Sequence, residues 1–300
     1  MDNRSEVREF LTSRRAKITP QQAGLPAYSA NRRVKGLRRE EVALLAGVSV
    51  EYYARLERGS LSGVSETVLD SLARALQLDE AERAHLADLA RTANTTRRTP
   101  RRRTPQPIRP ALQQLLDAMT EAPAFIRNGR LDILATNRLG RALYDPVFAD
   151  PARPANLARY QFLNPTAADF MPELDDQIAK SVALLRTEAG RDPYNRELTD
   201  LIGELSTRSE EFRALWAAHD VRLHQTGTKL FRHPAVGELS LAFEAMPVPI
   251  DPGLTLTALS AAPGTPSHDG LKLLASWAAT LDQDDYRPES ATTGDEPSRF

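Results

Sequence analysis

The first ninety residues of this chain place apolar positions at the spacing of an α-helix. Residues 40–46 and 50–57 are predicted to form two short helices separated by three residues. Val68, Leu69 and Leu72 form an apolar stripe that opens after Ser65, a suitable N-cap. A helix before Pro20 and another from Asp79, where Glu82 would complete a capping box, extend the pattern. We therefore expect an all-α domain of five helices over residues 1–93.

The pattern changes after a stretch rich in arginine and proline, residues 94–108, which has the composition of a linker. Short apolar runs flank Asn128-Gly129 in residues 124–137, a hairpin signal, and further strands are predicted over 227–233, 237–245 and 254–260. Residues 138–225 are predicted to form mostly helices and loops, and a last helix is predicted over 267–281. Residues 109–281 therefore predict an α+β domain around a five-stranded antiparallel sheet, followed by a disordered tail over 282–300.

Composition and charge narrow the class of protein. The 300 residues are 41% hydrophobic and 26% charged, which suits two globular domains, and the absence of cysteine excludes disulfides and thiolate chemistry. No apolar stretch approaches the roughly 18–20 residues of a membrane span, and the polar N-terminal segment is unlike a secretory signal, so we expect a soluble cytoplasmic protein. Residues 1–110 carry a net charge of +8 and the remainder −9, which suggests a polyanionic partner for the first domain.

The most specific stretch is GLRREEVALLAGVSVEYYARLERG, residues 36–59. Gly47 can end a first short helix in a left-handed conformation, Val48 can fill the corner, and Ser49 can cap a second helix. Tyr53 and Leu56 would point inward. The opposite face of that second helix would then be free to enter a major groove.

These residues resemble the XRE (Cro/repressor-like, lambda-repressor-like) helix-turn-helix domain. The stretch RRVKGLRREEVALLAGVSVEYYARLERG, with APAFIRNGRLDILATN and FRHPAVGELSLAFE further along, is similar to the MmyB-like bacterial regulators. That resemblance implies a DNA-binding domain followed by a PAS-like ligand-binding domain with an antiparallel sheet.

The resemblance also implies roles for residues of the first domain. Arg55 would donate hydrogen bonds to the edge of a guanine, and Tyr52 would contact a thymine methyl group or a phosphate. Glu51 would either accept a hydrogen bond from a cytosine amino group or only complement the helix dipole. Glu57 would form a buried ion pair with Arg15. The predicted DNA contacts are Arg38, Arg39, Val50, Glu51, Tyr52, Arg55 and Arg58, with Arg32 and Arg33 in a segment that is either a basic arm or a solvated loop.

For the second domain the resemblance implies an apolar cavity that binds a small hydrophobic ligand, with a fatty acid or acyl compound as the first candidate. The predicted ligand-binding residues are Phe125, Leu134, Asn137, Phe162, Trp216, His219, Phe231 and His233. The aromatic residues fit an ordinary core equally well, and the histidines fit structural roles. His219 and His224 are five residues apart, which does not favour a helical metal pair, and we expect no cofactor.

The motifs and the charge asymmetry together predict a transcriptional regulator, expected to be a repressor, that binds double-stranded DNA at an inverted repeat as a homodimer. Two alternatives stay open. The second domain could bind a protein partner rather than a metabolite. Catalysis is the other alternative, although the chain has no G-x-S-x-G, H-E-x-x-H, P-loop or dinucleotide motif.

Overall fold

The N-terminal part of the computed structural model consists of five helices. The structure describes residues 3–25, 34, 36–94, 108–218 and 226–285, so Arg32, Arg33, His219, His224, most of the predicted linker and the end of the tail lie outside the described residues. The five helices are α1 (Asn3–Lys17), α2 (Arg39–Ala46), α3 (Val50–Glu57), α4 (Glu66–Ala75) and α5 (Glu80–Asn94). All five were predicted. The helix α4 ends at Ala75, two residues before Gln77, which adopts a left-handed φ of 47°.

Local capping explains where these helices begin. The hydroxyl of Ser49 accepts a hydrogen bond from the Tyr52 amide, and Ser65 caps α4 in the same way. Asp79 and Glu82 form the predicted reciprocal capping box at 2.8 and 3.1 Å. The apolar stripes of the helices then meet in one buried core, which includes Phe10, Leu11, Val42, Tyr53, Leu56, Leu72 and Leu89.

The C-terminal part is built on one five-stranded antiparallel sheet. Its strands are β1 (Ala124–Arg127), β2 (Ile133–Thr136), β3 (Thr226–His233), β4 (Gly237–Pro247) and β5 (Thr255–Ser260), in the order β2-β1-β5-β4-β3. Its helices are α6 (Pro110–Ala118), α7 (Arg138–Leu143), α8 (Asp145–Phe148), α9 (Leu157–Leu163), α10 (Ala167–Phe170), α11 (Leu174–Arg191), α12 (Arg196–Arg208), α13 (Glu210–Ala217) and α14 (Pro266–Asp285). The predicted α+β domain is therefore confirmed.

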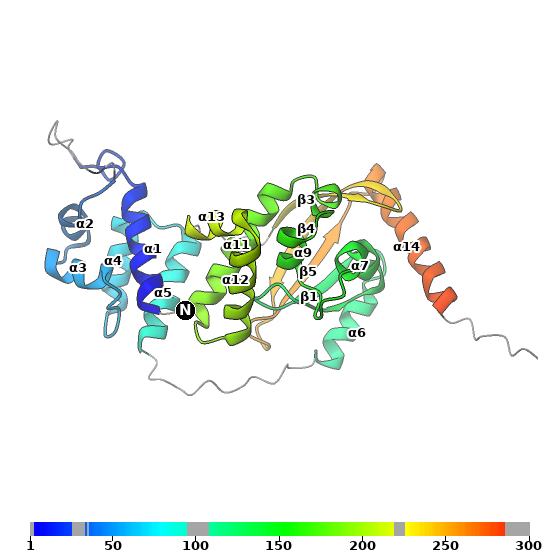
Figure 1. The fold of residues 1–300 in the computed structure, drawn as a ribbon, viewed down its shortest axis with the longest axis horizontal. Coiled ribbons are helices and arrows are strands. Elements are labelled where there is room, and N and C mark those ends of the chain that lie inside the picture. The colour runs from blue at the N-terminus through cyan, green and yellow to red at the C-terminus, as the bar shows by residue number, and fades with distance from the viewer. Residues whose placement is uncertain (1–2, 26–33, 35, 95–107, 219–225, 286–300) are drawn as a thin grey trace, which may run out of the picture.

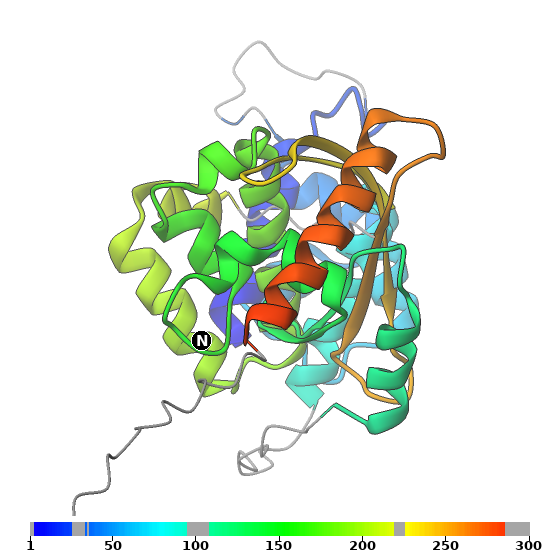
Figure 2. The same ribbon diagram turned by 90° about the vertical axis from the view of Figure 1, so that its right-hand side faces the viewer.

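The two faces of the sheet carry different cores. On the inner face, Leu239, Leu241 and Phe243 of β4 alternate with exposed residues and join a large core shared with α7, α11 and α14. On the outer face, α6 packs Leu112 and Leu116 against Ile126 of β1. Figure 1 shows α11 between the sheet and the N-terminal helices, and Figure 2 shows α14 crossing in front of the sheet.

The β1–β2 hairpin forms where Asn128-Gly129 predicts it, but with a longer turn. Residues 128–132 connect the strands, and Leu131, not Gly129, takes the left-handed φ of 67°. The Asn128 side chain accepts from the amides of Arg130 and Asp132 at 2.9 and 3.0 Å, which holds this wider loop in place of a two-residue turn.

The two parts of the chain contact each other through α1, α5 and α11. Arg186 of α11 is fully buried, and its Nη1 lies 2.6 Å from Glu6 Oε1 of α1. Its Nη2 donates to the Trp216 carbonyl of α13, and the guanidinium carbon lies 4.2 Å from the centre of the Trp216 ring. Gly190 permits the close approach of α5, because a Cβ there would lie 2.5 Å from the His85 ring. We call Glu6, Arg186 and Trp216 the interdomain cluster.

Candidate nucleic-acid interface and ligand-binding domain

The α2–turn–α3 unit has the geometry that its sequence predicts. Gly47 ends α2 with a φ of 66°, and the Val48 amide donates to the Ala43 carbonyl at 3.0 Å. Ala43, Tyr53 and Leu56 are buried between the helices. The face of α3 that carries Tyr53 and Leu56 is therefore packed against the rest of the domain, and the opposite, outer face of α3 is exposed to solvent.

The outer face of α3 carries the residues predicted to contact DNA. Val50 is 42% exposed, Glu51 and Arg55 are exposed, and Tyr52 is half-buried. The Arg55 guanidinium carbon lies 4.8 Å from the centre of the Tyr52 ring, a contact that restricts the arginine before any DNA binds. In Figure 1, α3 lies at the end of the molecule far from the sheet, so the C-terminal domain does not cover this face.

A buried carboxylate anchors the base of α3. Glu57 is 1% exposed and accepts from Arg15 Nε at 2.6 Å, which is the predicted ion pair, and also from Arg39 Nε. Arg15 donates further to the Leu37 carbonyl at 3.0 Å. Arg39 was predicted to hold a phosphate, but its Nε is committed to Glu57. Only the remaining nitrogens of its 56% exposed side chain are available to DNA.

The other predicted phosphate contacts flank the unit. Arg38 precedes α2, where its amide donates to Glu41 at 2.6 Å and its side chain pairs with Glu40 at 3.3 Å. Arg58 follows α3 and is exposed. Arg38 and Arg58 thus stay candidates for contacts with the phosphate backbone, because the side chains of both are exposed at the ends of the helix-turn-helix unit.

The aromatic residues predicted to contact a ligand form two groups in the C-terminal core. Phe125 and Phe231 are buried and meet the Tyr144 ring edge-on, with centroids 5.0 and 5.6 Å away. Phe162 and Trp216 instead contact Phe212, at 5.1 and 5.5 Å. Both groups belong to the large inner core. The structure therefore does not gather the four residues around one site.

The remaining described candidates are engaged elsewhere. Asn137 caps α7 and bridges to Ala124, Met119 and Ala122 through four hydrogen bonds in all. His233 contacts the Ala142 carbonyl through Nε2 and accepts from the Ala235 amide through Nδ1, while burial lowers the pKa of its ring. Leu134 is 37% exposed. These three positions give a ligand-binding role no support, because their polar atoms are satisfied or their side chain faces solvent.

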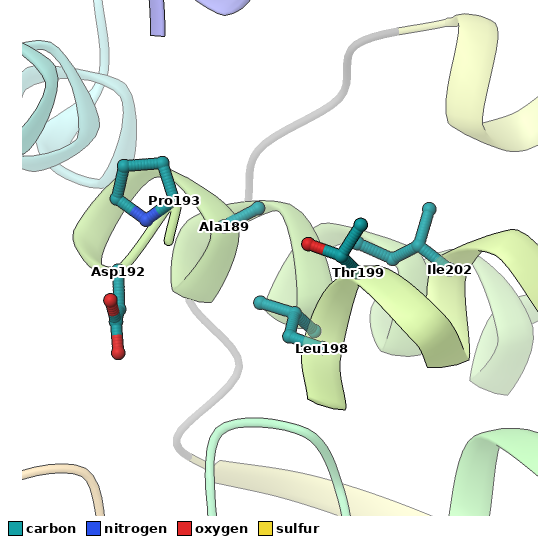
Figure 3. A pocket seen from close by; sticks show the side chains of 6 residues that line it. All are labelled: Ala189, Asp192, Pro193, Leu198, Thr199 and Ile202. Atoms are coloured by element: carbon teal, nitrogen blue, oxygen red, sulfur yellow. The ribbon is translucent and has the colours of Figure 1, made fainter. Parts of the chain in front are cut away.

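Two hollows in the described part of the chain are small or shallow. The hollow drawn in Figure 3 has a volume of about 30 Å³ and is lined by Ala189, Asp192, Pro193, Leu198, Thr199 and Ile202, between α11 and α12. A pocket for a drug-sized ligand needs roughly 300 Å³ or more. A broader surface hollow of about 410 Å³ lies on the outer face of β3, β4 and β5. Neither hollow includes a residue predicted to bind ligand.

Two cations on the inner face of the sheet were missed by the sequence analysis. Arg127 of β1 is only 8% exposed, and Lys229 of β3 lies with its ammonium group 4.9 Å from the centre of the Phe243 ring. The available signal was strand alternation, since Arg127 follows the core residue Phe125 by two positions.

An exposed recognition helix on a five-helix domain, joined to a separate α+β domain, defines the class of DNA-binding transcriptional regulators. The comparisons agree with this class. A family model described as "Helix-turn-helix domain" matches residues 9–86. A second model, described as "MmyB-like transcription regulator ligand binding domain", matches residues 108–274. The chain belongs to the family of MmyB-like transcription regulators. The comparison with curated proteins gives no match. Among the described residues, no helix has the length and apolar character needed to cross a bilayer.

Proposed function

We propose that this protein is a sequence-specific transcriptional repressor that binds an inverted-repeat operator as a homodimer and responds to a small hydrophobic ligand. The observation that carries the proposal is the outer face of α3, where Glu51 and Arg55 are exposed on a helix held from behind by Tyr53, Leu56 and Glu57. Such a helix can enter a major groove without any rearrangement of its own domain.

A homodimer follows from the small footprint of one recognition helix. A single α3 contacts few base pairs, which gives too little discrimination against the many competing sites of a genome. Two copies related by a twofold axis would read two half-sites about 34 Å apart. The ligand would then act by favouring one relative arrangement of the two reading helices.

The proposal is tested by comparing selected and scrambled DNA. A duplex is selected from a random library with the wild-type protein, and its affinity is measured by fluorescence anisotropy against a scrambled duplex at one salt concentration. We expect Arg55→Ala to lose about 1–3 kcal/mol of discrimination, because a bidentate contact to guanine contributes that much.

The matched control is Arg74→Ala. Arg74 is an exposed arginine of α4 in the same domain. It carries the same charge as Arg55 but does not lie on the outer face of α3. Its removal should leave discrimination unchanged. Undiminished discrimination in Arg55→Ala would show that α3 does not read sequence through Arg55.

A further inference from the structure

The outer face of the sheet is open over β3, β4 and β5 in the part of the chain that the structure describes. Along β4, core residues alternate with five exposed ones, Glu238, Ser240, Ala242, Glu244 and Met246. The helix α6 covers only the neighbouring part of this face, where its leucines pack on β1 and β5. Figure 2 shows α6 on this side of the sheet, whereas the other side carries the helices of the large core. The open face therefore has room for a second layer.

The side chains of the open face allow another protein surface to approach closely. The middle of the face is a hollow of about 410 Å³ whose lining is mostly small, with Thr228, Ser240, Ala242 and Ser260 among its residues. Toward α6 the face becomes apolar, since Met246 is 43% exposed and Leu115 of α6 is 49% exposed. Gln113 bonds to β2, so Leu115, on the opposite side of α6, faces the open strands. A hollow of small residues with an apolar border is typical of a protein contact.

The charged residues of the open face make its two ends complementary. At one end, Arg232 lies opposite Glu238 in the register, and its 55% exposed side chain is 3.4 Å from that carboxylate. At the other end, Glu244 accepts from the Thr226 hydroxyl at 2.7 Å and has no cationic partner among the described residues. A half-turn about an axis that crosses the strands midway between these ends exchanges them. It brings the arginine of one copy to the unpaired glutamate of another.

The location of the open face also agrees with DNA binding by two copies. The helix α3 lies at one end of the long axis of the molecule, and β3, β4 and β5 run obliquely across that axis (Figure 1). In Figure 2, which looks along the same axis, α6 and the open face lie to one side. A twofold axis that crosses these strands within the open face therefore puts both copies of α3 at the same end of a dimer, as an inverted repeat requires. The helices α1 and α5 are already engaged with α11.

We propose that a second copy of this chain packs on the open face, with the strands of the two subunits close to antiparallel and Arg232 of each subunit paired with Glu244 of the other. The inference rests on the proposed function, because it assigns a surface to the proposed homodimer. Packed sheets keep their strands within about 30° of alignment, which is compatible with this pairing. Each Arg232 would then lie between two carboxylates, Glu238 of its own subunit and Glu244 of the other, and Glu244 would gain a cation.

The test exchanges the two charges. Sedimentation equilibrium gives the dissociation constant of the full-length dimer for the wild type, Arg232→Glu, Glu244→Arg and the double variant. Each single reversal should raise that constant about tenfold or more, because it places like charges together at both ends of the interface. The double reversal should return it to within about threefold of the wild type. Ala242→Arg, which puts a long charged side chain in the middle of the open face, should also weaken the dimer. Arg196→Glu reverses a 93% exposed arginine of α12, on the other side of the sheet, and should behave as the wild type.

All four positions are exposed, so the melting temperature of each variant should stay close to that of the wild type, and a change in mass then reports the contact itself. An unchanged dissociation constant in the single reversals and in Ala242→Arg would overturn this inference and leave a homodimer with another interface. Failure of the double reversal to recover the dimer would do the same. A wild type that stays monomeric and binds the selected duplex as a single copy would overturn both the inference and the proposed homodimer.

Discussion

At the scale of single residues, Glu57 connects the stability of the N-terminal domain to its function. Its carboxylate is buried, holds Arg15 on α1, and takes Arg39 of α2 as a second partner. The Glu57 carboxylate, at the end of α3, therefore connects α3 to both α1 and α2. The residue that pairs with Arg15 therefore also fixes the orientation of α3.

The first prediction concerns this carboxylate. Glu57→Gln should lower the free energy of unfolding by about 3–5 kcal/mol, because Arg15 would be left largely buried without a counter-charge. Urea denaturation measures the change. Glu40→Gln, which removes an exposed carboxylate paired with Arg38, should cost less than about 1 kcal/mol. Equal losses in the two variants would show that burial of Glu57 contributes nothing.

At the scale of elements, the helices and strands follow from local patterning, whereas the buried charges do not. Serine caps, the Asp79–Glu82 box and the alternation of β4 each act within a few residues, so the sequence predicts them. The ion pair of Glu6 with Arg186 joins residues 180 positions apart and depends on the packing of α11 against α1, which periodicity does not describe. For the same reason the sequence did not reveal Arg127 and Lys229 on the inner face of the sheet. It also did not reveal that Leu134 is exposed and that Asn137 caps α7.

A second prediction compares two caps of one domain. Ser49→Ala and Ser65→Ala each remove a hydroxyl that accepts from the first turn of a helix, α3 and α4 respectively. Each should lower the free energy of unfolding by about 1 kcal/mol. DNA affinity should fall further for Ser49→Ala, because the first turn of α3 carries Val50, Glu51 and Tyr52. Anisotropy titrations with both variants measure this, and equal affinities would argue against groove entry by that turn.

At the scale of the whole molecule, the interdomain cluster is one of the contacts that join the core of the C-terminal domain to the DNA-binding domain. Val182, Leu185 and Ala189 of α11 belong to the core beside the sheet, and Arg186 of the same helix pairs with Glu6 of α1. Burial raises the pKa of Glu6, and the charge of Arg186 opposes that rise. A shift of α11 caused by a ligand would therefore reach α1 through one buried ion pair.

The last prediction tests that route with a double-mutant cycle. Arg186→Met should lower the free energy of unfolding by about 3–5 kcal/mol, since Glu6 would be buried without its counter-charge, and adding Glu6→Leu should recover most of the loss. Arg191→Met removes a 54% exposed arginine of the same helix and should cost less than about 1 kcal/mol. The double variant should still bind the selected duplex. The effect of decanoic acid, used as a probe for the proposed hydrophobic ligand, on that binding should be reduced. The reason is that an apolar contact tolerates a movement of α11 that a directional ion pair would transmit. Additive losses of unfolding free energy in the two single variants would contradict this prediction, and so would an undiminished effect of the acid in the double variant. Either result would mean that the two domains are coupled through another contact, such as that of His85 with Gly190.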